Sequence, residues 1–101
     1  MTSEEGHIRT VARQAVCAMV GRHIEVSVNT DRVLASKPGT SAKALVQIDM
    51  LGPDGAAHRG NVTASAKVEA AAWGTDEIVS AARRAADRIL TKYPSWRLPT
   101  G

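Results

Sequence analysis

The residues from Asn61 to Leu90 constrain the fold of this chain more than any other segment. Their first part alternates between small apolar and polar side chains, which is the period of a strand with one buried face. Trp73-Gly74 ends the alternation, and Thr75-Asp76-Glu77 begins an Ala-rich stretch with helical periodicity. The segment therefore predicts a long strand that leads directly into a helix, so the chain must combine sheet and helix.

Size and composition favour one globular domain. The chain has 101 residues, and its hydrophobic share of 44% is mostly Ala and Val, with no Phe. A core of small side chains is thin, and burying each larger apolar group contributes about 1.5–3 kcal/mol. We predict a single domain over residues 1–94 with a C-terminal tail at 95–101, and a monomer that gains stability from neighbouring subunits.

An N-terminal helix is predicted from Ser3 to Val20, followed by a strand from Ile24 to Val28. One apolar stripe at helical spacing comprises Ile8, Val11, Ala12, Ala15, Val16 and Met19. Gly21 is expected to end the helix, and Cys17, beside the stripe, is expected to be a buried and unreactive thiol. The composition of Asn29-Thr30-Asp31 predicts a turn after the strand.

The next strand is predicted from Lys43 to Leu51, after a loop at 36–41. Its side chains Val46, Ile48 and Met50 share one face, whereas Leu45 and Leu51 lie on the other. Gly52-Pro53-Asp54-Gly55 is a turn signal, because Pro presets the backbone and Gly accepts a positive φ. This strand should therefore pair as a hairpin with the strand that begins at Asn61.

The third strand is predicted to run from Asn61 to Trp73, with a row of small side chains on its inner face. These are Val62, Ala64, Ala66, Val68, Ala70 and Ala72. Such a row suits a helix that lies close to the sheet. Thr75 is expected to cap the last helix, with Asp76 and Glu77 in its first turn. Its buried stripe should comprise Ile78, Val79, Ala82, Ala85, Ala86 and Ile89, with Asp87 paired to Arg83 and Pro94 ending the helix.

The predicted order is α-β-β-β-α. Two helices on one face of an antiparallel three-stranded sheet make a two-layer α+β sandwich.

The chemistry of the side chains gives no reason to expect an enzyme. His7, His23 and His58 are dispersed and Cys17 is the only cysteine, so neither a metal site nor a disulfide is expected. No glycine-rich phosphate loop and no nucleophile elbow is present in the sequence. We therefore predict no catalytic residue and no cofactor, and we expect a cytoplasmic protein without a membrane span.

Aromatic and basic residues near the C-terminus are the candidate interface residues. Trp73 could plug the end of the sheet against Tyr93 or the tail, or contact another subunit, since aromatics are enriched at interface cores. Trp96 and Leu98 are expected to form an arm that docks on a neighbour. The basic group Arg83, Arg84, Arg88, Lys92 and Arg97 is either a solvated face or a contact for an acidic partner, in a chain of net charge +3.

Three features together resemble the tail terminator proteins of long-tailed bacteriophages. They are the helix Glu4 to Val20 leading to the strand Ile24 to Val28, the hairpin Lys43 to Trp73, and the ending Lys67-Val68-Glu69-Ala70-Ala71-Ala72-Trp73-Gly74-Thr75 before the helix Asp76 to Leu90. The ending is similar to the strand, aromatic-Gly and Ala-rich helix of that family. The likeness in order and pattern covers about 85 residues, and the likeness in residues about 25.

The resemblance implies a structural virion protein that caps the tail tube and joins it to the head. It implies a homo-oligomeric ring, usually of six copies, that contacts the tail tube protein and the head–tail connector proteins. DNA would pass through the ring without sequence readout. The protein would be found in the virion tail after assembly in the host cytoplasm.

Three other functions stay open. Double-stranded-RNA-binding domains share the α-β-β-β-α order, but they place lysines where this chain has Thr75-Asp76-Glu77. In a ribosome-associated hibernation factor, the opening strand is similar to Arg22-His23-Ile24-Glu25-Val26, although that family begins with the strand and has more basic helices. The third is a regulatory or immunity module that binds another protein.

Overall fold

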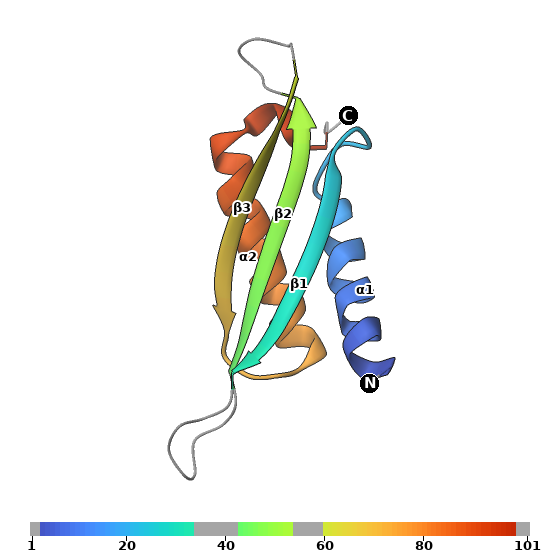
Figure 1. Cartoon of the computed structure of the whole chain (residues 1–101), viewed down its shortest axis with the longest axis vertical. Helices are drawn as coiled ribbons and strands as arrows, with labels where there is room; N and C mark the ends of the chain where they lie inside the picture. Colours follow the sequence, from blue (N-terminus) through green and yellow to red (C-terminus); the bar gives the residue numbers. More distant parts are fainter. Residues whose placement is uncertain (1–2, 34–42, 54–59, 99–101) are drawn as a thin grey trace.

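The computed structural model describes residues 3–33, 43–53 and 60–98 (Figure 1). Its elements are α1 (Ser3–Cys17), β1 (Glu25–Val33), β2 (Lys43–Pro53), β3 (Asn61–Ala70), α2 (Thr75–Lys92) and the short 3-10 helix η1 (Pro94–Trp96). Both long helices lie behind the sheet in Figure 1. The predicted α-β-β-β-α order and the two-layer α+β class are confirmed.

The sheet is antiparallel, with the order β1-β2-β3. The predicted hairpin is confirmed, because β2 pairs with β3 from Ala44 opposite Ala70 to Pro53 opposite Asn61. The turn predicted at 29–31 is wrong: these residues continue β1 and lie opposite Gln47, Val46 and Leu45. Their turn-forming composition is a weak local preference, and pairing along the whole length of β2 overrides it.

Gly52 and Pro53 do not form the predicted turn either, since they are the last residues of β2. Gly52 is required there by close packing. A Cβ atom at this position would lie 2.6 Å from Cδ1 of Ile24 and 2.7 Å from Cε2 of Trp96. Residues 54–55, like the loop predicted at 36–41, lie outside the described residues.

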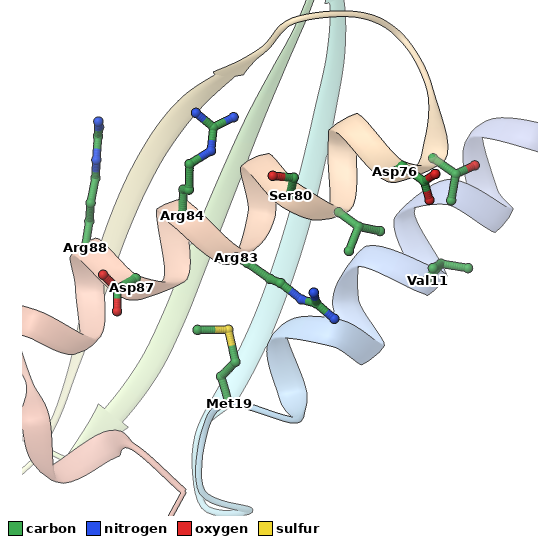
Figure 2. A pocket seen from close by; sticks show the side chains of 10 residues that line it. Val11, Met19, Asp76, Ser80, Arg83, Arg84, Asp87 and Arg88 are labelled. Carbon is green, nitrogen blue, oxygen red and sulfur yellow. The ribbon is translucent and has the colours of Figure 1, made fainter.

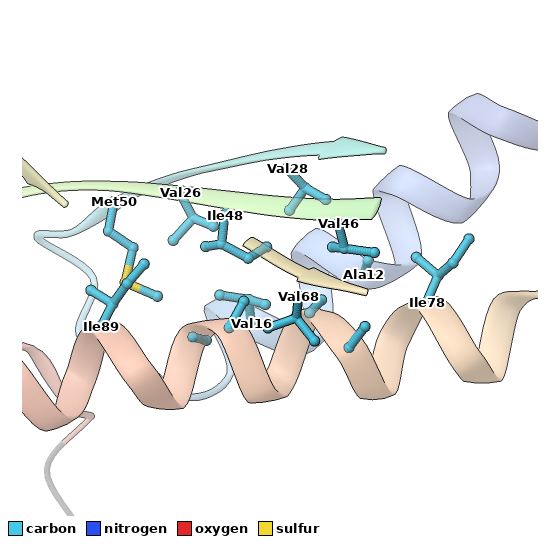
Figure 3. Packing of buried hydrophobic residues seen from close by; sticks show 14 of the residues in the cluster. Ala12, Val16, Val26, Val28, Val46, Ile48, Met50, Val68, Ile78 and Ile89 are labelled. Atoms are coloured by element: carbon cyan, nitrogen blue, oxygen red, sulfur yellow. The ribbon is translucent and has the colours of Figure 1, made fainter. Parts of the chain in front are cut away.

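The hydrophobic core lies between the sheet and the two helices (Figure 3). Val46, Ile48 and Met50 are fully buried, as their alternation predicts. From α1 come Ile8, Ala12 and Val16, and from α2 come Ile78, Ala81, Ala82, Ala85, Ala86, Ile89 and Leu90. Because the middle of α2 presents alanines to the sheet, the helix axis can approach the strands closely. This is the arrangement predicted from the small side chains on the inner face of β3.

The ends of the helices differ from the sequence predictions. Helix α1 ends at Cys17, and the backbone N–H of Gly21 donates to the carbonyl of Trp96 at 3.0 Å. Gly21 therefore joins the C-terminal segment and does not terminate the helix. Cys17 is exposed, because it follows buried Val16 by one position and points away from the stripe. The N-cap of α2 is Gly74, without a side-chain cap, and Thr75 is the first helical residue.

The C-terminal segment is part of the folded domain. The Trp96 side chain is 0% exposed, its ring stacks on Tyr93 with centroids 4.3 Å apart, and its Nε1–H donates to the Pro53 carbonyl at 3.0 Å. The N–H of Leu98 donates to the Met19 carbonyl at 3.0 Å. The predicted docking arm is therefore wrong for Trp96, whose large apolar ring closes the end of the core. Residues 99–101 lie outside the described residues.

Trp73 follows the end of β3, which stops at Ala70 instead of reaching Trp73. Its side chain is half-buried and packs against the core. Tyr93 lies at the other end of α2, about 27 Å away for an 18-residue helix. Trp73 therefore helps to close the end of the core where α2 begins, and it does not pack against Tyr93 or the C-terminal segment.

Candidate protein interface

The face of the sheet turned away from the helices is not covered by any described element. We call it the open face; in Figure 1 it is turned toward the reader. Its side chains come from the odd-numbered strand positions, which alternate with the core positions. Those with described side chains are Glu25, Ser27, Asn29, Asp31, Lys43, Leu45, Gln47, Asp49, Leu51, Pro53, Asn61, Thr63, Ser65, Lys67 and Glu69. The open face is thus a broad polar surface on which Leu45 and Leu51 are half-buried.

A polar cluster around Asp49 organises the centre of the open face. The Ser65 hydroxyl donates to the Asp49 carboxylate from the opposite position on β3, and Gln47 Nε2 donates to the same oxygen at 3.0 Å. These hydrogen bonds, that of Ser65 foremost, lower the pKa of Asp49 below its ordinary value. Asp49 is therefore a negatively charged group held in a defined position at neutral pH.

A shallow hollow of about 170 Å³ lies beside this cluster. Glu25, Asp49 and Leu51 contribute to its lining. Glu25 stands directly opposite Leu51, so Asp49 is its diagonal neighbour, and side chains in that relation are about 7–8 Å apart. Across the sheet, Lys43 Nζ lies 3.1 Å from Glu69 Oε1, so part of the positive charge of the open face is already paired. The hollow consequently combines the carboxylates of Glu25 and Asp49 with the apolar side chain of Leu51.

On the opposite side of the molecule, an open groove of about 840 Å³ runs between α1 and α2 (Figure 2). Val11 and Met19 come from the α1 side, and Val79 from α2. The polar and charged lining comes from α2: Thr75, Asp76, Ser80, Arg83, Arg84, Asp87 and Arg88. In Figure 2, Arg83 extends toward α1, whereas Arg84 and Arg88 extend together in another direction. We call this site the helix groove.

Each of the two outer strands accepts a backbone hydrogen bond from an arginine side chain on a helix. Arg13 Nε of α1 donates to the Val26 carbonyl of β1 at 3.0 Å, and Arg88 Nη1 of α2 donates to the Lys67 carbonyl of β3 at 3.4 Å. Bonds of this kind occupy carbonyl groups that an added strand would need. The open face and the helix groove are therefore better candidates for contact surfaces than the strand edges.

The structure separates the predicted interface residues. Arg84 and Arg88 lie on the wall of the helix groove, whereas Trp96 is in the core and Trp73 is half-buried. Leu98 is 46% exposed. Asp87 does not pair with Arg83 as predicted.

Asp87 instead accepts from Arg97 Nη2 at 2.8 Å, an ion pair between α2 and the segment after η1. That segment folds back onto the end of α2, which brings Arg97 within reach. Arg83 extends toward α1 in Figure 2.

From Leu45 and Leu51 the sequence predicts a cover over the outer face of the sheet as well. No described element covers that face, and sequence reasoning did not name it as a candidate site. The Asp49–Ser65 contact depends on the register between β2 and β3, and the sequence does not fix that register because the tip of the hairpin is long.

The described residues contain no group of three or more His, Cys, Asp or Glu side chains that could hold a metal ion. Within the same part of the chain, no helix has the length and apolar character needed to cross a membrane. No family model matches this sequence, and no curated protein or solved structure is significantly similar to it.

Proposed function

We propose that this chain is a structural subunit that acts by binding other protein subunits, and specifically a tail terminator that caps a phage tail tube. The observation that supports this proposal most is the open face. It is a whole side of the sheet that the described chain leaves uncovered, and it carries two half-buried leucines and a fixed carboxylate. A flat surface of mixed character suits a protein contact better than it suits a small-molecule substrate.

The thin core supports the same function. The α2 face that meets the sheet is built mainly from alanines, so each residue of this layer buries little apolar area. A subunit with a small core gains stability when a partner covers an exposed face. An assembled ring would supply such cover for every copy.

The choice of a tail terminator among structural subunits rests on the resemblance in sequence. A tail terminator requires one surface for a sister subunit and another for the tube protein. The open face and the helix groove lie on opposite sides of the domain and could each contact a sister subunit, one on either side of a copy. In this proposal the chain has no substrate and requires no cofactor.

A tube-capping assay tests the proposal. The tube protein encoded nearest to this chain would be assembled into tubes with and without the purified chain. We expect the chain to sediment with the tubes in an amount that follows the number of tube ends, and to stop their elongation. A chain that stays in the supernatant, or that coats the tube walls in proportion to tube length, would contradict the proposal.

The nucleic-acid alternative rests on one specific observation. Arg84, Arg88 and Lys92 are spaced four residues apart and are exposed on α2, so they form a basic row that could follow a phosphate backbone. Asp76 and Glu77 precede this row on the same helix and would oppose a polyanion. Salt-sensitive, sub-micromolar binding of duplex RNA to the purified chain would favour this alternative over the structural subunit.

A further inference from the structure

We propose that the helix groove of one copy docks on the open face of the next, with Arg84 and Arg88 against the hollow lined by Glu25, Asp49 and Leu51. This inference rests on the proposed function, because it specifies how sister subunits would meet. The contact joins two different surfaces, so it is a head-to-tail contact, which generates a ring when the rotation between copies closes.

The charges of the two layers are complementary. The exposed side chains of α2 and the segment after it include Arg83, Arg84, Arg88, Lys92 and Arg97, against Asp76, Glu77 and Asp87. Asp87 is already paired with Arg97. The open face has Glu25, Asp31, Asp49 and Glu69 against Lys43 and Lys67, and Lys43 is paired with Glu69. Among the described side chains, α2 with the segment after it is therefore net basic and the open face is net acidic.

The spacing of the charged groups also agrees. Arg84 and Arg88 are one helical turn apart, which places their Cβ atoms about 5–6 Å from each other. Glu25 and Asp49 are diagonal neighbours on the sheet, about 7–8 Å apart. Long arginine side chains can span this difference, and Figure 2 shows both of them extending in the same direction. Arg88 Nη1 donates to the Lys67 carbonyl at 3.4 Å within one copy, and in the contact it would exchange this exposed bond for a carboxylate of the next copy.

Apolar groups on both surfaces favour a second copy over a nucleic acid as the partner. The helix groove includes Val11, Met19 and Val79, whose apolar side chains cannot donate hydrogen bonds to a phosphate backbone. Half-buried Leu51 stands beside the two carboxylates of the hollow and can pack on such a surface. The open face of the same chain thus presents acidic and apolar groups together, which complement the basic and apolar groups of the helix groove.

A charge-swap experiment tests the contact in the full chain. One variant carries Arg84→Glu and Arg88→Glu, and the other carries Glu25→Lys and Asp49→Lys. In low-salt buffer, sedimentation velocity should show self-association of the native chain, weakened by about tenfold or more in each variant. An equimolar mixture of the two variants should recover association, because the reversed groove then meets the reversed face.

Two further samples keep the result interpretable. The single variants Glu25→Lys and Arg84→Glu replace exposed side chains only, and they should show the same loss and recovery if a double variant fails to fold. The matched control, Arg9→Glu with Arg22→Glu, makes the same change in net charge as Arg84→Glu with Arg88→Glu but lies outside both surfaces, and it should associate like the native chain. Equal loss of association in this control would overturn the proposed contact.

The remaining outcomes distinguish a failure of the proposed contact from a failure of the proposed function. If the native chain caps tubes and every variant assembles as it does, the contact is wrong and the proposed function stands. If the native chain neither self-associates nor binds tubes, the proposed function fails and the contact with it. If all the proteins are monomers and Arg84→Glu with Arg88→Glu abolishes binding of duplex DNA, the groove is a polyanion site and the contact is refuted.

Discussion

Trp96 shows how a single residue connects segments that lie far apart in the chain. Its ring lies over Gly52 at the end of β2, stacks on Tyr93 after α2, and is held by a hydrogen bond to Pro53. The same segment pairs with residues 19–21 after α1 through the Val20–Arg97 bridge. A residue that looks like part of a tail in the sequence therefore closes the core.

We predict that Trp96→Ala lowers the free energy of unfolding by about 3–5 kcal/mol, because it removes a fully buried aromatic ring. Trp96→Phe keeps the stack on Tyr93 and should cost less, about 0.5–1.5 kcal/mol for the lost hydrogen bond to Pro53. Urea unfolding followed by far-UV circular dichroism measures both. Native stability in Trp96→Ala would show that the C-terminal segment is peripheral to the core.

Asp49 predicts a pH dependence of stability. Its pKa is lower in the folded chain than in the unfolded chain, so below about pH 4 the unfolded state binds more protons and stability falls. Asp49→Asn should reduce stability by about 0.5–1 kcal/mol at pH 7, since the carboxylate is partly exposed. The difference from the native chain should shrink as the pH falls through the folded pKa of Asp49. Urea unfolding between pH 7 and pH 2 tests this, and a constant difference would contradict it.

At the scale of the elements, the close contact between α2 and the sheet depends on small side chains. Ala81, Ala82, Ala85 and Ala86 are fully buried on the helix, and Ala70 on β3. Larger side chains at these positions would force the helix away from the strands. The alanine content of both elements is therefore a packing requirement as well as a helix preference.

We predict that Ala85→Leu lowers the free energy of unfolding by about 1–3 kcal/mol, because the added atoms have no space between α2 and the sheet. Ala18→Leu makes the same substitution at an exposed position and should change stability by less than about 0.5 kcal/mol. Thermal and urea unfolding of the two variants decide this. Equal effects at both sites would mean that the layer between helix and sheet is loosely packed.

The element order could be predicted from the sequence because period two and helical periodicity are local properties of the chain. The errors arose where long-range contacts decide the structure. Asn29-Thr30-Asp31 has a turn composition, but pairing with β2 makes it a strand. Gly21 and Trp96 depend on contacts between segments far apart in the chain. The open-face hollow depends on register, and so only its individual residues could be read in advance.

At the scale of the whole molecule, the described side chains make α2 with the segment after it net basic and the open face net acidic. In the proposed contact these two unlike surfaces attract each other, and screening by salt should weaken the attraction. Arg13 donates to the Val26 carbonyl of the outer strand β1 and so disfavours strand addition at that edge. Both features favour the proposed assembly by contacts between faces.

Electron microscopy of tail tubes incubated with the native chain tests whether this protein acts as a subunit of a larger assembly. We expect one added ring of density at the end of each tube, built from repeated copies of a 10.7 kDa domain. Bare tube ends at saturating concentrations of the chain, with the protein still at the mass of a single copy, would contradict it.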